Sequence, residues 1–188
     1  MHWKQHIEYV CDKLRQFLAQ ITILKKRIPF KTKLSLYNAL CESVINYGLS
    51  SYGKTYPTYL NQIYNLQMRI LKHVVSRNVL DSYKNEERGI FKHCKILPIS
   101  EKVNKCLLVE HFFRDDIKKR VEHDVQTRAV TQVRLCTSRA NNVYGERTLR
   151  YLLPRLINGL PNNILDCLTP TNINSKLKNY FYMHLSRS

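Results

Sequence analysis

Residues 3–26, WKQHIEYVCDKLRQFLAQITILKK, are the stretch that decides the fold. Apolar side chains recur there at every third or fourth position: Trp3, Ile7, Val10, Leu14, Phe17, Ile21 and Leu24. This spacing places them along one face of an α-helix, so we predict a helix over about residues 3–26. No capping residue precedes the helix, and we therefore expect the chain to be cut from something larger.

Two further amphipathic helices follow. The first is predicted over about residues 32–47 and ends at Gly48. Its inward face consists of Leu34, Tyr37, Leu40, Cys41, Val44 and Tyr47. The second is predicted over about residues 56–76, with Thr55 or Thr58 as its N-terminal cap. Its inward face consists of Leu60, Ile63, Leu66, Ile70, Leu71 and Val74. Each apolar face needs a partner face, so the sequence predicts a three-helix bundle over residues 1–80.

The remainder, residues 81–188, is predicted to be a mostly helical C-terminal region. A short helix is expected near residues 82–93 and a long one over about 101–123, with Val103, Leu107, Phe113, Ile117 and Val121 facing inward. A last helix, about 171–186, groups Ile173, Leu177, Phe181 and Leu185. Residues of about 124–150 form an exposed, arginine-rich connection, and RTLRYLLP at 147–154 is predicted to be a short extended segment. The fold class is therefore all-α.

The chain is strongly basic. It has 31 Lys and Arg against 14 Asp and Glu, a formal charge of +17, and nucleic acid is the commonest partner of such an excess. Both halves are basic. Residues 1–80 contain 12 basic and 3 acidic side chains, and residues 81–188 contain 19 basic and 11 acidic side chains. The alternative is a basic protein that has no polyanionic partner.

The candidate nucleic-acid-binding residues are cations in regions with few acids. They are Lys25, Lys26, Arg27, Lys31 and Lys33 in one turn, Arg69, Lys72 and Arg77 further on, and Arg147, Arg150 and Arg155 in the C-terminal region. Tyrosines are interleaved with them, namely Tyr37, Tyr47, Tyr52, Tyr56, Tyr59 and Tyr64. Cations that meet phosphates beside rings that stack on bases are typical of a surface that binds any sequence. For Tyr37 and Tyr47, packing inside the bundle is the favoured interpretation.

We assign no catalytic and no metal-binding residue. FFRDD at 112–116 has the letters of a polymerase metal motif, but Asp115 and Asp116 fall inside a predicted helix, next to cations that would pair with them. A polymerase pair needs a turn between strands instead. The spacings of Cys94, Cys106, His111 and His123 fit no zinc motif. No cofactor is expected in this chain.

The six cysteines include no C-x-x-C pair, and no signal peptide precedes them. We interpret them as reduced, mostly packed thiols of an intracellular protein, nuclear or cytoplasmic. No run of 18 apolar residues is present, so no membrane partner is expected.

The order of several short motifs resembles the region after the palm domain in reverse transcriptases of animal non-LTR retrotransposons, the jockey-like and related elements. The first matches are Trp3, His6, Ile7, Val10, Lys13 and Leu14, then Leu36, Tyr37, Leu40, Tyr47, Gly48 and Gly53. Next come Leu66, Gln67, Ile70 and Leu71, and the Leu-Pro-Ile of ILPIS at 96–100. The last are Tyr144, Arg147, Thr148, Asn158, Leu160 and Pro161. Tyr52 and Ile157 stand where the family has Trp.

The resemblance implies a thumb domain, about residues 1–80, followed by a C-terminal tail, which together grip an RNA/DNA primer–template duplex. It also implies an RNA-directed DNA polymerase whose catalytic aspartates and Mg²⁺ belong to a palm domain upstream of Trp3. We therefore expect no polymerase activity from this chain alone. The alternatives are a domesticated helical module that binds an acidic protein, and a decayed copy without function.

Overall fold

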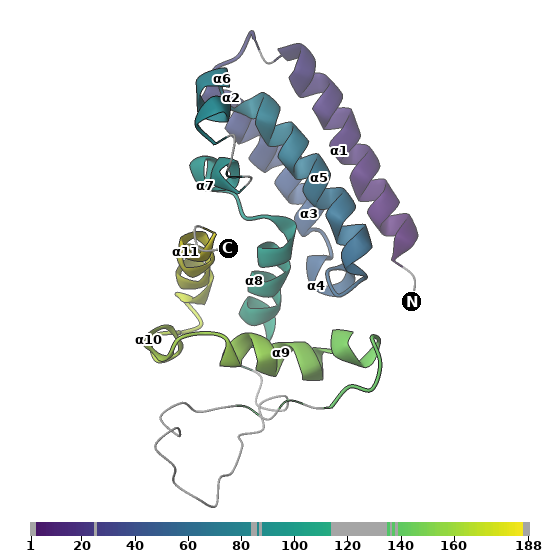
Figure 1. Ribbon diagram of the computed structural model, residues 1–188, viewed down its shortest axis with the longest axis vertical. Helices are drawn as coiled ribbons and strands as arrows, with labels where there is room; N and C mark the ends of the chain where they lie inside the picture. Colours follow the sequence, from purple (N-terminus) through teal and green to yellow (C-terminus); the bar gives the residue numbers. More distant parts are fainter. Residues whose placement is uncertain are drawn as a thin grey trace, which may run out of the picture. The chain divides into compact units, whose positions relative to one another are not determined.

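The computed structural model describes residues 3–24, 26–83, 86, 88–113, 135, 137 and 139–185. Every regular element in these ranges is a helix, which confirms the predicted all-α class (Figure 1). Contacts divide the chain into two compact units: Met1–Val103 with Tyr180–Ser188, and Asn104–Asn179. No helix of the described part is long and apolar enough to cross a membrane.

Helix α1, Lys4–Leu24, confirms the periodicity of the opening stretch. Its buried residues are Ile7, Val10, Cys11, Leu14, Phe17 and Ile21. The helix packs along α5, Pro57–Val74, which buries Ile63, Leu66, Gln67, Met68, Ile70, Leu71 and Val74. Full burial of one such aliphatic or aromatic side chain contributes about 1.5–3 kcal/mol. The paired stripes of α1 and α5 are therefore the main hydrophobic contact of the first unit (Figure 1).

The second helix of the bundle has three parts: α2 (Phe30–Leu36), a π-helical turn η1 (Tyr37–Glu42) and α3 (Ser43–Asn46). Its chain direction is opposite to that of α1 and α5 (Figure 1). The predicted inward face is wrong at two positions, since Leu40 is 48% and Tyr47 75% exposed. Tyr37 and Cys41 are buried as predicted, and Lys33 and Ile45 complete a buried face with a constant step of four. A π-helical turn holds more residues than an α-turn, so it shifts the inward face along the sequence.

Two glycines bound the short helix α4, Leu49–Tyr52, for different reasons. Gly48 has φ 69°, in the left-handed region that other residues adopt at a cost. Gly53 has an ordinary φ, but a Cβ there would lie 2.5 Å from the Leu49 carbonyl oxygen and 2.6 Å from Val103 Cγ2. Gly53 is thus required by close packing against α8, Ile99–His111, the helix that contains Val103.

The first unit continues beyond residue 80, the boundary predicted from the sequence. Two short helices, α6 (Arg77–Ser82) and α7 (Gly89–Cys94), stand where one helix near 82–93 was predicted. Helix α7 packs on α5, and the Phe91 ring stacks on Tyr64 at 5.6 Å. Helix α7 thus belongs to the bundle, and the contact of Val103 with Gly53 agrees with a compact unit that extends to Val103.

Helix α8 ends at His111, and Phe113 is 44% exposed, against the prediction that it faces inward. Val103 and Leu107 are buried as predicted. Residues 114–134 lie outside the described residues, so the predictions for Asp115, Asp116, Ile117 and Val121 concern positions that the structure does not describe.

The second unit contains η2 (Gly145–Arg147), α9 (Leu149–Asn158), α10 (Asn162–Leu165) and the first turns of α11 (Ile173–His184). The prediction of an extended segment at 147–154 is wrong, because α9 begins at Leu149 and buries Leu153 and Ile157 on one face. Tertiary burial of that face outweighs the Pro154 within the helix.

Asn158 has a structural role that its place in the family-like motif does not reveal. Its side-chain Nδ2 donates to the Leu135 carbonyl at 3.0 Å, and its Oδ1 accepts from the Leu135 N–H at 2.8 Å. The amide therefore satisfies both backbone groups of a buried residue, as a neighbouring strand would. Only an amide side chain offers a donor and an acceptor in this arrangement.

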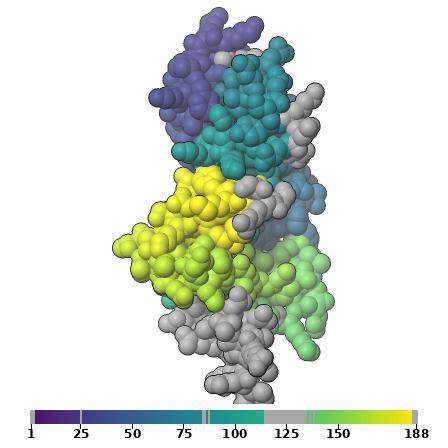
Figure 2. All heavy atoms as spheres, turned by 60° about the vertical axis from the view of Figure 1, so that its left-hand side comes forward, coloured from purple at the N-terminus to yellow at the C-terminus, as the bar shows by residue number. Residues whose placement is uncertain are grey.

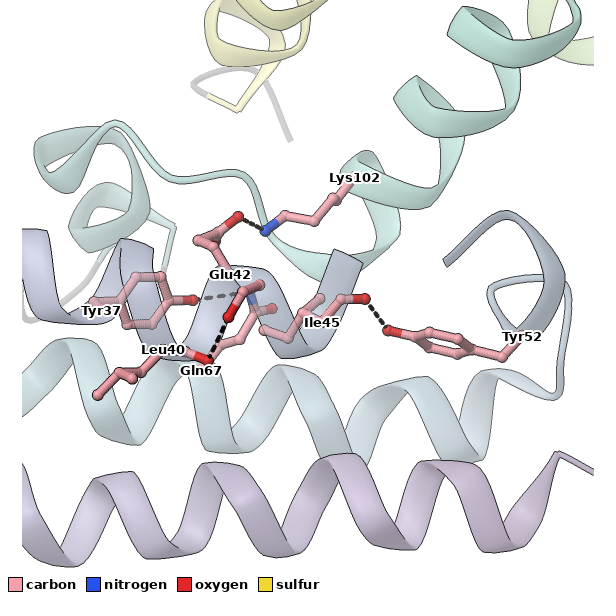
Figure 3. Close-up of polar contacts among 8 residues, drawn as sticks. Tyr37, Leu40, Glu42, Ile45, Tyr52, Gln67 and Lys102 are labelled. Carbon is pink, nitrogen blue, oxygen red and sulfur yellow. Dashed lines mark hydrogen bonds and ion pairs between the residues drawn. The ribbon is translucent and has the colours of Figure 1, made fainter. Parts of the chain in front are cut away.

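Polar side chains cross the interior of the first unit. Gln67, fully buried on α5, donates to the Tyr37 hydroxyl at 3.1 Å, and Lys102 forms an ion pair with Glu42 (Figure 3). The Tyr52 hydroxyl donates to the Ile45 carbonyl at 2.5 Å. Buried polar groups need such partners, and these contacts link α5, η1, α3, α4 and α8.

Burial also changes the acidity of the thiols and phenols in this interior. It raises the pKa of Cys94 to about 12 and raises that of Cys41 further. Desolvation likewise raises the pKa of Tyr37 and of Tyr182. The low-dielectric interior disfavours the thiolate and the phenolate, so these groups keep their protons further into the alkaline range than exposed ones do.

We expect the free energy of unfolding to fall in alkaline solution. The unfolded thiols ionise near pH 9.0, whereas Cys94 in the folded chain resists ionisation until about pH 12. A raised folded pKa gives stability that is present below pH 9 and is lost as the pH rises through that window. Urea unfolding between about pH 8 and about pH 10.5 should show a loss of about 2–4 kcal/mol.

The Cys41→Ala and Cys94→Ala variants are the controls for this alkaline effect. Each should be less stable at neutral pH but should lose less stability as the pH rises, because one titrating thiol is gone. An unchanged pH dependence in both variants would contradict the assignment.

Candidate nucleic-acid interface

Six of the predicted cations lie at one end of the first unit. Lys26 and Arg27 are in the turn between α1 and α2, Lys31 is in the first turn of α2, Arg69 and Lys72 are near the end of α5, and Arg77 begins α6. All six are exposed. We call these six residues the basic end. Lys25 lies outside the described residues.

The up-down-up path of the bundle brings the two groups of cations together. Helix α2 begins beside the C-terminal end of α5, and α6 follows directly (Figure 1). The Phe30 ring of α2 lies 5.6 Å from His93 of α7, and Tyr83, which follows α6, lies 6.2 Å from the same imidazole. Segments some 40 residues apart thus form one surface, with α2 and α6 adjacent at the top of the molecule in Figure 2.

The basic end has no acidic partners among the described residues. No ion pair joins any of its six cations to a described Asp or Glu, whereas Lys4 pairs with Glu8 at 3.9 Å and Arg15 with Asp12 at 2.5 Å on α1. Gathered cations that lack counter-charges create a positive potential, which a polyanion relieves by displacing counterions. The charge distribution, beyond the net charge, thus favours a phosphate backbone as the ligand.

The outer face of α5 adds neutral donors to these cations. Gln62, Asn65, Arg69 and Lys72 follow one another at steps of three and four, and all four are exposed. Helix α5 contains no acidic residue. The resulting stripe offers amide and cationic donors along one helix face, which suits phosphate and sugar oxygens of any sequence. Gln62 and Asn65 were not among the predicted interface residues, because that prediction rested on cations and interleaved tyrosines.

Lys33 does not belong to this surface. It is only 8% exposed, and its Nζ donates to the Val74 carbonyl at 3.5 Å, at the last residue of α5. A cation at a helix C-terminus interacts favourably with the helix dipole and with the unpaired carbonyls there. The structure therefore gives Lys33 an internal role, and we remove it from the candidate interface.

Lys92 and Lys95 are exposed cations near the same end that the sequence did not single out. They belong to α7 and to its C-terminal cap. The prediction of a boundary at residue 80 separated them from the bundle, and no local signal in the sequence shows that α7 packs on α5.

The second unit has its own arginine cluster. The Arg155 guanidinium lies 5.2 Å from the Tyr151 ring and donates to the Tyr151 hydroxyl at 3.0 Å, and Arg147 lies 5.8 Å from the Tyr144 ring. Arg150 and Arg155 are exposed, and Arg147 is half-buried. An aromatic ring holds the plane of a guanidinium while its N–H edge stays available to phosphate oxygens.

The tyrosines differ from one another in the structure. Tyr37 is fully buried, as the packing interpretation requires, whereas Tyr47 is 75% exposed and contradicts it. Tyr52 is buried, and Tyr56, Tyr59 and Tyr64 are half-buried.

No set of three His, Cys, Asp or Glu side chains converges in the part of the chain that the structure describes. Cys94, Cys106 and His111 therefore form no such group, and His123 lies outside the described residues.

Comparisons with protein-family models, with curated proteins and with solved structures found no match. The likeness to reverse transcriptases rests on the ordered motifs of the sequence.

Proposed function

We propose that this chain is the thumb and C-terminal region of a non-LTR retrotransposon reverse transcriptase and that it grips the primer–template duplex. The observation that carries the proposal is the basic end, six exposed cations that no described acid neutralises. The bundle suits the task because its packed core holds these cations at fixed positions. The ordered resemblance to thumb motifs supports the same function.

The proposed mechanism is sequence-independent binding. The cations of the basic end and the Gln62 and Asn65 amides contact phosphates and sugars, which carry no direct base information. The duplex can therefore advance by one base pair without loss of contacts. The arginine cluster of the second unit supplies further phosphate contacts. Nucleotide transfer and its Mg²⁺ belong, in this proposal, to the carboxylates of a palm domain.

The test is the salt dependence of duplex binding. Fluorescence anisotropy of a labelled RNA–DNA heteroduplex should give a dissociation constant in the micromolar range near physiological salt. Six phosphate contacts would give a slope of about −5 for log K against log salt, at about 0.9 per contact. A slope near zero, or no binding at low salt, would refute the proposal.

The alternative is a helical module that binds an acidic protein, and one observation favours it. Ile23 is 73% exposed, and Leu24 and Phe30 are each 36% exposed, next to Lys26 and Arg27. An acidic peptide with apolar side chains would match this mixture of cations and apolar groups. Such a complex would keep most of its affinity at high salt, because apolar burial is not screened.

A further inference from the structure

A group of four neighbouring aromatic rings, two exposed and two half-buried, lies at the end of the first unit opposite the basic end. We name Trp3, His6, Tyr9 and Tyr47 the aromatic patch. His6 is at its centre, with ring centroids 6.0 Å from Trp3, 6.4 Å from Tyr9 and 6.2 Å from Tyr47. Trp3 directly precedes α1, His6 and Tyr9 lie in its first turns, and Tyr47 lies in the turn after α3.

Two rings of the patch are exposed to an unusual degree, while Trp3 and His6 are half-buried between them and the helix bundle. Tyr47 is 75% and Tyr9 54% exposed, although burial of an aromatic ring is strongly favourable. Contiguous exposed aromatic surface commonly marks a binding site. Tyr47 does not take part in helix packing. After the π-helical turn η1, Ile45 is the buried residue of this segment, and Tyr47 points outward.

The rings stand on a rigid base. His6 lies 5.0 Å from the ring of Tyr52, which is fully buried and whose hydroxyl donates to the Ile45 carbonyl. Directly after Tyr47, the left-handed Gly48 fixes the direction of the chain. A platform held in this way loses little conformational entropy when a flat ligand stacks on it.

The charges around the patch favour a polyanionic ligand. Lys13 Nζ lies 5.7 Å from the Tyr9 ring, and Lys54 follows Tyr52 by two residues. The acids nearest along α1 already have partners, since Glu8 pairs with Lys4 and Asp12 with Arg15. The rings of Tyr, His and Trp have polar edges, which suit a ligand that is both flat and polar.

We propose that the aromatic patch stacks on an unpaired base of a single-stranded nucleic acid. Base–aromatic stacking tolerates any sequence because every base has a π-face, and nearby lysines hold the phosphates. The patch goes beyond the proposed function, since a thumb that grips a duplex through phosphates needs no stacking platform. It shares with that function the premise that the chain binds nucleic acid.

The position of the patch indicates how one nucleic acid would meet both sites. From Tyr9 to its last residue, Leu24, α1 spans about 22 Å at 1.5 Å per residue. This length equals about seven nucleotides of a duplex strand at 3.4 Å each. A duplex on the basic end that continues as a single strand would bring an unpaired base to the patch.

Trp3 makes the test specific, because it is the only tryptophan of the chain and belongs to the patch. Titration of the full chain with an oligothymidylate should quench the Trp3 fluorescence and yield a dissociation constant. An abasic oligonucleotide of the same length has the same phosphates but no rings. We expect it to bind at least about tenfold more weakly and to leave the Trp3 emission unchanged.

Variants of Tyr47 complete the test. Tyr47→Leu should weaken oligothymidylate binding about tenfold, and Tyr47→Phe should keep the wild-type affinity because the ring remains. Leu40→Ala, at another exposed apolar position of the same unit, should have no effect. Circular dichroism will verify that each variant is folded. We expect the Tyr47 variants to fold because the side chain is exposed and its replacement leaves the core unchanged.

The outcomes separate this inference from the proposed function. If the abasic strand binds as well as the thymidylate, or if Tyr47→Leu binds normally, the patch is not a stacking site, whatever the duplex result. If the heteroduplex fails to bind while Tyr47-dependent quenching persists, the inference stands and the duplex-gripping function falls. In turn, Tyr47→Leu should weaken single-strand binding about tenfold while its duplex affinity is unchanged.

Discussion

Reversal of two charges on α5, in the Arg69→Glu/Lys72→Glu variant, should weaken heteroduplex binding about a hundredfold near physiological salt. Both side chains are exposed and sit one turn apart on a helix without acids. The variant removes two phosphate contacts and places two carboxylates against the backbone, where repulsion replaces attraction. The salt slope should decrease in magnitude by about two, one unit for each lost cation. Anisotropy with the same labelled duplex measures both quantities.

The matched control is Lys4→Glu/Arg15→Glu, which changes the net charge by the same amount. Both residues lie on the exposed face of α1, in ion pairs with Glu8 and Asp12 and outside the basic end. This variant should keep duplex affinity to within about threefold, because screening suppresses interactions beyond a Debye length of about 8–10 Å. If both variants lose affinity equally, the chain binds through its net charge, and the basic end is not a defined interface.

Loss of the internal ion pair should have the largest effect on stability. We expect Lys102→Met to lower the free energy of unfolding by about 2–4 kcal/mol, as measured by urea denaturation. The Glu42 side chain is 20% exposed and Lys102 9%, so the variant leaves a carboxylate charge in a largely desolvated site. The pair joins the start of α8 to the π-helical turn η1, as Figure 3 shows.

The double variant Glu42→Gln/Lys102→Met tests whether the unpaired charge causes this loss. Neutral replacement of both partners leaves no isolated charge, so stability should recover by at least half. If the double variant is as unstable as Lys102→Met, the lysine contributes through packing of its aliphatic stem. The single variant Glu42→Gln should lie between the two, since the glutamine amide oxygen can still accept a hydrogen bond from the Lys102 ammonium.

The predictable part of the fold is the part in which local periodicity and tertiary packing agree. Helix α1 was located to within two residues at each end because its apolar positions continue without interruption over 21 residues. The same reasoning located α5 and its buried stripe. It failed for the face of the second helix, where a π-helical turn changes the number of residues per turn, and the turn has no clear sequence signal.

The sequence predicted which kind of residue forms the candidate interface, but it did not predict correctly which individual residues belong to it. Charge counting found Lys26, Arg27, Lys31, Arg69, Lys72 and Arg77, and all six are exposed. It could not distinguish Lys33 from Lys31, since only the packing of α2 against α5 shows that Lys33 reaches the Val74 carbonyl. It also favoured burial for Tyr47, which the structure exposes.

The sequence by itself determined the all-helical class, the stripes of α1 and α5 and the excess of positive charge, because these depend on residue type and spacing along one element. Tertiary structure decided which residues meet: the cations of two distant segments at one end, the rings of α1 and the turn after α3 at the other, and the Asn158 amide on Leu135. Such contacts depend on the direction in which each helix packs, and a one-residue change in register reassigns every side chain of its face. A local pattern therefore predicts an element, whereas a binding surface exists only once the elements have packed.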